Sequence, residues 1–217
     1  MRELPPGSAP TVAVVGPVGA GKSALRGLFR EFGAATLDFD GYSRDLLAAG
    51  TPETAAVRAA WGEPYVRPDG TVDRAALGAL VFADDAARTR LEAIVHPPML
   101  ALLRRRLEDF RRAPEAPLLA VEGAILGRLA AGTFDALIVV DAPPAVRRQR
   151  LEQGKGLTPE AALRLVALHE RLGIGRDPAD FVVDNGGSPA ELRAQAEELW
   201  RRLTGRDPGT LAPGNAL

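Results

Sequence analysis

Residues 16 to 23 read Gly-Pro-Val-Gly-Ala-Gly-Lys-Ser, and they are the most informative stretch of the chain. They follow a short apolar run, Thr11-Val-Ala-Val-Val15, which is typical of a buried strand. The residues after the glycine-rich stretch place apolar side chains at helical spacing up to Phe32, and Gly33 marks the end of that helix. A buried strand, a glycine-rich turn and an amphipathic helix therefore follow one another.

The glycine-rich turn fits the pattern G-x-x-x-x-G-K-[S/T], in which each position has a chemical task. Glycines let successive backbone N–H groups point inward at phosphate oxygens, and the start of the following helix adds its positive end. Lys22 supplies a compact positive charge for the outer phosphates, and the hydroxyl of Ser23 is a ligand for Mg²⁺. The turn thus predicts a site for a nucleoside triphosphate with Mg²⁺. The predicted nucleotide contacts are Gly16, Val18, Gly19, Ala20, Gly21, Lys22, Ser23 and Ala24.

Four more strand-sized apolar segments, separated by helical patterns, follow along the chain. These segments are residues 34–39, 118–121, 136–140 and 181–184. Short apolar strands that alternate with helices predict an α/β fold, with a five-stranded parallel sheet flanked by helices. Together with the phosphate-binding turn, this order predicts the P-loop NTPase fold.

The organisation between the strands is also predictable. The gaps at 41–117 and 142–180 are longer than one crossover helix needs, so each is expected to carry an inserted subdomain. The first gap is mostly helical, and its long periodic stretch at 88–112 is expected to be interrupted at Pro97-Pro98. We expect one domain over residues 11–203, with flexible tails at 1–10 and 204–217.

The composition excludes several classes of protein. The chain has 217 residues, 46% of them hydrophobic and 25% charged, and no cysteine, which excludes disulfides and cysteine-ligated metal sites. Its 27 basic and 28 acidic residues leave a net charge of −1, so nucleic acid and anionic membranes are not expected partners. No apolar run is long enough to span a membrane and no signal region is recognised, so we expect a cytoplasmic protein.

A second candidate site, Asp38-Phe-Asp-Gly-Tyr-Ser-Arg44, follows the second predicted strand. Ligands gather at the carboxyl ends of strands in open α/β sheets, so this segment is expected to face the phosphate loop. A carboxylate there could accept a proton from an attacking hydroxyl, and Arg44 could clamp a phosphate. These residues alone leave open a simpler reading, a helix N-terminus with favourable acidic side chains.

At this point the motifs resemble those of the dephospho-CoA kinase family, over about residues 11–203. The matching segments are the phosphate loop, the D-x-D-x-x-x-R segment, Pro68-Asp-Gly-Thr-Val-Asp-Arg74, His96-Pro97, Arg150 and Ala179-Asp-Phe-Val-Val-Asp-Asn-Gly186. The resemblance implies transfer of phosphate from ATP, with Mg²⁺, to the ribose 3′-hydroxyl of dephospho-CoA, the last step of coenzyme A synthesis. It further implies an acceptor-binding insert at about 41–112, a lid at about 150–177, and a monomer or weak homo-oligomer.

The resemblance also implies a role for each matching residue. Asp40 would be the general base, and Lys22 and Arg150 would complete the catalytic set. Four residues would lie on the acceptor side: Asp38, Arg44, His96 and Glu122. Asn185 and Gly186 would lie beside the adenine. For His96 a plain helix-capping role stays open.

The chain departs from the family pattern in two places. The third strand ends in Val121-Glu122-Gly123 without the usual proline, which leaves the register of Glu122 open by one residue. In the lid, Gly154-Lys155 stands where the family has an Arg-Asp pair, and His169 aligns with a family glutamine but is expected to face solvent or pack. Because Lys155 and Lys22 are the only lysines, Lys155 is a hypothetical replacement for the missing arginine charge, which the ATP turnover of Lys155→Ala would test.

Two other functions stay open on these residues. One is a phosphate-loop kinase with another small acceptor, such as a nucleoside or nucleotide. The other is a nucleotide-binding sensor that has lost catalysis, which the altered lid would favour and the retention of Lys22, Ser23 and Asp40 would not.

Overall fold

The computed structural model describes residues 8–175 and 177–209. Within them the chain forms two compact units. One takes the described residues up to Asp38 and from Leu107 onward, and the other is Phe39–Arg106. Of the tails predicted at 1–10 and 204–217, residues 1–7 and 210–217 lie outside the described residues.

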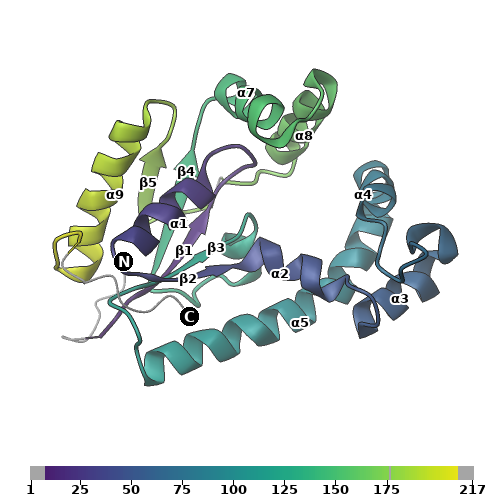
Figure 1. The fold of residues 1–217 in the computed structure, drawn as a ribbon, viewed down its shortest axis with the longest axis horizontal. Helices are drawn as coiled ribbons and strands as arrows, with labels where there is room; N and C mark the ends of the chain where they lie inside the picture. The colour runs from purple at the N-terminus through teal and green to yellow at the C-terminus, as the bar shows by residue number, and fades with distance from the viewer. Residues whose placement is uncertain (1–7, 176, 210–217) are drawn as a thin grey trace. The chain divides into compact units, whose positions relative to one another are not determined.

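The first unit is built on a parallel sheet (Figure 1). Its strands are β1 (Thr11–Val15), β2 (Ala35–Asp38), β3 (Leu119–Glu122), β4 (Ala136–Asp141) and β5 (Phe181–Asp184). Their order is β2-β3-β1-β4-β5, and every pairing is parallel. The predicted α/β class and five-stranded parallel sheet are confirmed. All five strands end at the same edge of the sheet, so β1, β3, β4 and β5 deliver their last residues close to the phosphate loop.

Helices flank the sheet and make up most of the second unit. They are α1 (Lys22–Glu31), α2 (Phe39–Leu46), α3 (Pro52–Trp61), the 3₁₀ turn η1 (Glu63–Tyr65), α4 (Arg74–Ala83), α5 (Asp85–Arg112), α6 (Leu126–Leu129), α7 (Pro144–Lys155), α8 (Pro159–Arg171) and α9 (Pro189–Thr204). The caps predicted from sequence are present at α8 and α9, where Thr158 accepts the N–H of Ala161 and Ser188 accepts that of Glu191. No helix among the described residues is both long and apolar enough to cross a bilayer.

The main core lies between the sheet and the helices α1 and α9. Phe29 of α1 and Trp200 of α9 are buried, and their ring centroids are 6.4 Å apart. Phe32 adds an edge-to-face contact with Trp200 at 5.8 Å. This core holds α1 against the sheet, and it thereby holds the phosphate loop that leads into α1.

The helices α7 and α8 lie next to each other (Figure 1), and a second, smaller core lies between them. Leu151, Ala162 and Val166 are its buried members. Val18, which belongs to the phosphate loop, packs against this cluster. The pair of helices therefore has its own hydrophobic contact with the loop.

In the second unit, the sequence 68–74 forms a tight turn followed by a helix cap. Arg67 N–H donates to Thr71 O at 2.8 Å across the turn, and Asp73 caps α4 by accepting from the N–H groups of Ala75 and Ala76. The predicted interruption of the long helix is wrong, because α5 continues through Pro97 and Pro98. Each proline removes one N–H donor, and the regular bonds on either side keep the helix continuous.

Candidate functional site

The phosphate loop connects β1 to α1 and depends on its glycines. Gly16, Gly19 and Gly21 all have positive φ angles, of 146°, 77° and 99°. A Cβ atom on Gly16 would lie 2.1 Å from Val140 O, and one on Gly21 would lie 2.0 Å from Asn185 Nδ2. Both the backbone conformation and the close neighbours therefore require glycine at these positions.

Two positively charged side chains contact backbone carbonyl groups of this loop. The ammonium of Lys22 is buried and donates to Gly16 O at 3.0 Å and to Pro17 O at 3.4 Å. Arg150 Nη1, from α7, lies 3.4 Å from Ala20 O and 3.5 Å from Gly19 O. The structure thus brings the predicted residues Lys22 and Arg150 to one loop from two helices, as an anion site for phosphate requires.

Asn185 supports the same loop from the end of β5. Its side-chain amide is buried and donates to Ala20 O at 2.7 Å, while its backbone N–H donates to Asp141 O at 2.8 Å. Gly186 follows, with its N–H on Asp184 Oδ1. The contact with Ala20 makes Asn185 a support of the loop, and the contact of both residues with adenine stays a prediction.

Ser23 and the predicted acidic residues form a connected polar group. The hydroxyl of Ser23 donates to Glu122 Oε1 at 2.6 Å, and Glu122 is the buried last residue of β3. Asp38, at the end of β2, is the residue in register with Glu122. Arg26 Nε lies 2.9 Å from Glu122 Oε2, and Arg26 Nη1 lies 3.9 Å from Asp38 Oδ2. The strand register places Glu122 beside Asp38, and its match to the acidic residue of the family pattern stays a prediction.

Sequence reasoning missed Arg26. The available signal was its place one helical turn after Ser23, which puts both side chains on the same face of α1. Arg26 offsets part of the negative charge that two neighbouring carboxylates bring to the end of the sheet.

The Ser23–Glu122 pair fits a hard divalent cation that arrives with phosphate. Mg²⁺ usually takes one or two protein oxygens and completes its octahedron with phosphate oxygens and water. Among the residues that the structure describes, no cluster of three or more acidic or histidine side chains could hold a metal by itself. Ser23 and Glu122 could supply at most two protein ligands, so a metal bound here would need further ligands from phosphate oxygens or water.

The remaining predicted residues belong to the second unit. Asp40 is half-buried in the first turn of α2, and Arg44 follows one turn later, exposed. His96 lies in the interior of α5, so the helix-capping reading is wrong. Burial lowers the pKa of His96, and the nearby Glu92 opposes the shift. The proposed contacts of these residues with an acceptor stay predictions.

His169, which was expected to face solvent or pack, makes a specific contact with the phosphate loop. It does not simply face solvent or pack, because its Nδ1 accepts a hydrogen bond from the backbone N–H of Val18 at 3.1 Å. Burial, and then the charge of Lys22, lower its pKa to about 4. Lys155 is exposed at the end of α7, and its role in place of an arginine stays a hypothesis.

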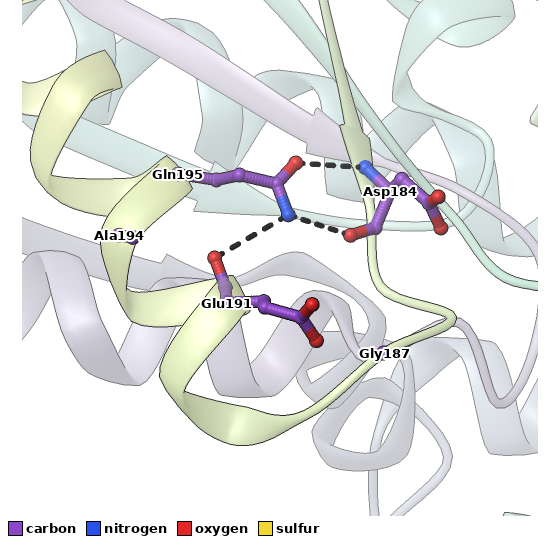
Figure 2. Close-up of a pocket in the computed structure, with 5 residues that line it drawn as sticks. All are labelled: Asp184, Gly187, Glu191, Ala194 and Gln195. Carbon is purple, nitrogen blue, oxygen red and sulfur yellow. Dashed lines mark hydrogen bonds between the residues drawn. The ribbon is translucent and has the colours of Figure 1, made fainter.

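An open groove lies at the end of β5, beside Asn185 and Gly186. It is lined by Asp184, Gly187, Glu191, Ala194 and Gln195 (Figure 2). The side chain of Gln195 accepts from Asp184 N at 3.1 Å and donates to Asp184 O at 2.7 Å, as a neighbouring strand would (Figure 2). Gln195 therefore satisfies the backbone N–H and C=O of Asp184, the last residue of the edge strand β5.

Comparison with known proteins shows similarity to one family of kinases. The family model described as dephospho-CoA kinase matches residues 10–191. A dephospho-CoA kinase from Frankia casuarinae is 42% identical over 196 residues, which cover 90% of this chain and 84% of the relative. A solved structure, TT1252 from Thermus thermophilus, has 28% identity and a TM-score of 0.72, covering 91% of this chain and 100% of its own.

A dephospho-CoA kinase structure from Campylobacter jejuni shares the fold. Its TM-score is 0.57 at 20% identity, with 90% of this chain and 98% of its own covered. At this identity the likeness concerns the fold alone, which is that of a phosphate-loop kinase. The family model and the Frankia relative both cover most of the chain, and the chain therefore belongs to the dephospho-CoA kinase family.

Proposed function

We propose that this protein transfers the γ-phosphoryl group of ATP to the ribose 3′-hydroxyl of dephospho-CoA. The observation that carries the proposal is the phosphate loop, with Lys22, Ser23 and Arg150 gathered on it at the carboxyl end of β1. Membership of the family supports dephospho-CoA over a nucleoside or another small acceptor, and supports catalysis over a sensor that only binds nucleotide.

The loop and its cations hold the triphosphate. The Val18 N–H donates to His169 Nδ1 and the Ala20 N–H to Pro17 O, so the phosphate oxygens are bound by the other backbone N–H groups of the loop. The ammonium of Lys22 turns from its carbonyl partners to the β- and γ-phosphates. Arg150 adds a second positive charge from α7 and excludes water that would hydrolyse ATP. When bound through Ser23, and Glu122 beside it, Mg²⁺ supplies further neutralisation of phosphate charge.

On the acceptor side Asp40 serves as the general base. Its carboxylate takes the proton of the 3′-hydroxyl as that oxygen bonds to the γ-phosphorus and the bond from that phosphorus to the bridging oxygen breaks. The products are coenzyme A and ADP. Arg44, His96 and Asp38 bind and orient the acceptor, and the helices at 41–112 form its pocket. Positioning and electrostatics supply most of the catalysis in such a transfer.

The test is an assay with ATP, Mg²⁺ and dephospho-CoA that follows ADP release and coenzyme A formation together. We expect Asp40→Asn to lose about 100-fold or more in kcat, because the amide cannot accept the proton, while its affinity for ATP stays at the wild-type level. Asp45→Asn is the matched control, since it removes the same charge from an exposed position of the same helix.

Two results would contradict the proposal. One is turnover of a nucleoside or another alcohol in preference to dephospho-CoA, which would assign another acceptor. The other is tight ATP binding by the wild type with no transfer to any acceptor, which would leave a nucleotide sensor. A wild-type rate for Asp40→Asn would remove Asp40 as the base without removing the activity.

A further inference from the structure

Five contacts join the first half of the phosphate loop to α7, α8 and the turn after α8. Val18 packs its side chain against the small core of Leu151, Ala162 and Val166. Arg150 Nη1 lies near the carbonyls of Gly19 and Ala20, and a Cβ atom on Gly19 would lie 2.7 Å from Arg147 O. The turn after α8 is equally close, since a Cβ on Gly175 would lie 2.6 Å from Pro17 Cδ.

The fifth contact is a hydrogen bond with a single possible direction. Val18 contributes a backbone N–H, and His169 Nδ1 accepts it at 3.1 Å. An imidazole nitrogen accepts only when it carries no proton, so the ring must be neutral with its proton on Nε2. The surroundings favour this form: burial and the cations Lys22, Arg147 and Lys155 lower the pKa of His169 to about 4, against the opposing effect of Glu170.

An ion pair joins α7 and α8 next to His169. The guanidinium of Arg147 is buried, donates to Ala142 O at 3.0 Å and pairs with the carboxylate of Glu170, the neighbour of His169 in α8. His169 is therefore held in place by an ion pair between the two helices while it holds Val18.

We propose that His169 is a positioning residue for nucleotide binding, which fixes the first half of the phosphate loop against α8 through the Val18 N–H. The inference rests on the proposed use of ATP by this loop. Val18 is held by the packing of its side chain and by the hydrogen bond of its N–H. The remaining N–H groups of the loop therefore keep a common direction toward the phosphates. Displacement of α8 removes this constraint, so the shape of the loop and the position of α8 change together.

The test compares two substitutions of His169 by isothermal titration with ATP and Mg²⁺, without any acceptor. His169→Gln keeps an acceptor oxygen, whereas His169→Leu keeps bulk and leaves the Val18 N–H unpaired. At neutral pH we expect the Leu variant to bind ATP about tenfold more weakly and the Gln variant to stay within about twofold of wild type. Leu163→Gln is the control, because that side chain is 56% exposed elsewhere on α8.

The pH dependence separates this role from a purely structural one. In the folded protein the pKa of His169 is lowered from 6.5 to about 4, so the ring is neutral at neutral pH and gains a proton only as the pH falls toward 4. As the pH falls through this range, the affinity of the wild type for ATP should therefore decrease relative to that of His169→Gln, which has no titrating group at this position. Nitrogen NMR of the wild type, which has only two histidines, should show His169 with its proton on Nε2 and slow hydrogen exchange at Val18.

The inference is overturned if His169→Leu binds ATP like wild type, or if folded His169→Gln binds no better than His169→Leu. It is equally overturned if His169 titrates near 6.5 and the Val18 amide exchanges freely, a result that needs no variant. None of these measurements uses dephospho-CoA. A protein that binds ATP as expected here and transfers nothing would refute the proposed function and leave the role of His169 intact.

Discussion

At the scale of single residues, Lys22 shows how a charge is kept available inside a protein. Only two of the 27 basic residues are lysines, and Lys22 lies buried with its ammonium on two carbonyls of its own loop. Those carbonyls lower the cost of burying the charge. A lysine suits this position because its compact ammonium rotates on a flexible stem, whereas the planar guanidinium of arginine needs a wider space.

We expect Lys22→Ala to lower kcat/KM for ATP by about 100- to 1000-fold, as for the loss of one preorganised group that stabilises developing charge. The measurement is steady-state kinetics with dephospho-CoA as acceptor. Circular dichroism is the control, since the fold should be retained. A folded variant with a wild-type rate would exclude Lys22 from catalysis.

At the scale of the element, the ends of helices carry much of the local information. The last helix, α9, begins with a full capping box, in which Ser188 accepts the Glu191 N–H while Glu191 accepts the Ser188 N–H at 2.6 Å. The backbone and hydroxyl hydrogen bonds from Ser188 lower the pKa of Glu191 below its ordinary 4.5. The box matters for the site because α9 packs against α1, which carries the phosphate loop.

The sign of this shift gives a pH-dependent prediction. A carboxyl whose pKa is lower in the folded state stabilises the fold above pH 4.5 and loses that contribution as the pH falls through its lowered value. Urea unfolding of wild type and Glu191→Gln should therefore differ most near neutral pH and converge below 4.5. A difference that stays constant with pH would show that the charge of Glu191 does not contribute.

At the scale of the whole molecule, the described chain divides into a unit with the sheet and a helical unit, Phe39–Arg106. The stability of the first unit rests on the core between the sheet, α1 and α9. Phe29 is fully buried in that core and contacts Trp200. Since α1 also begins at Lys22, the same core that stabilises the unit sets the position of the phosphate site.

We expect Phe29→Ala to lower the free energy of unfolding by about 3–5 kcal/mol, from lost burial and the cavity left behind. Urea denaturation with the same slope for both proteins would measure it. Phe82→Ala is a suitable control, because Phe82 is 40% exposed and should cost about 1 kcal/mol or less. Equal effects of the two substitutions would contradict the assignment of Phe29 to the main core.

Local sequence patterns were sufficient to predict much of the fold of this protein. The phosphate loop, the alternation of five strands with helices, and the caps at Thr158 and Ser188 all follow from residues close together in the chain. Such features depend on backbone freedom, periodicity and short-range hydrogen bonds, which neighbouring residues settle among themselves. Pro97 and Pro98 mark the limit, because propensity there predicted a break that the folded helix does not have.

The residue pairs that give the site its chemistry could be identified only in the tertiary structure. Ser23 meets Glu122 across 99 positions, and Val18 meets His169 across 151. Strand order and helix packing bring these residues together, and both arise from the burial of apolar side chains that are distant in sequence. A motif can state which groups a site needs, but the partner of each group depends on which distant surfaces pack against one another.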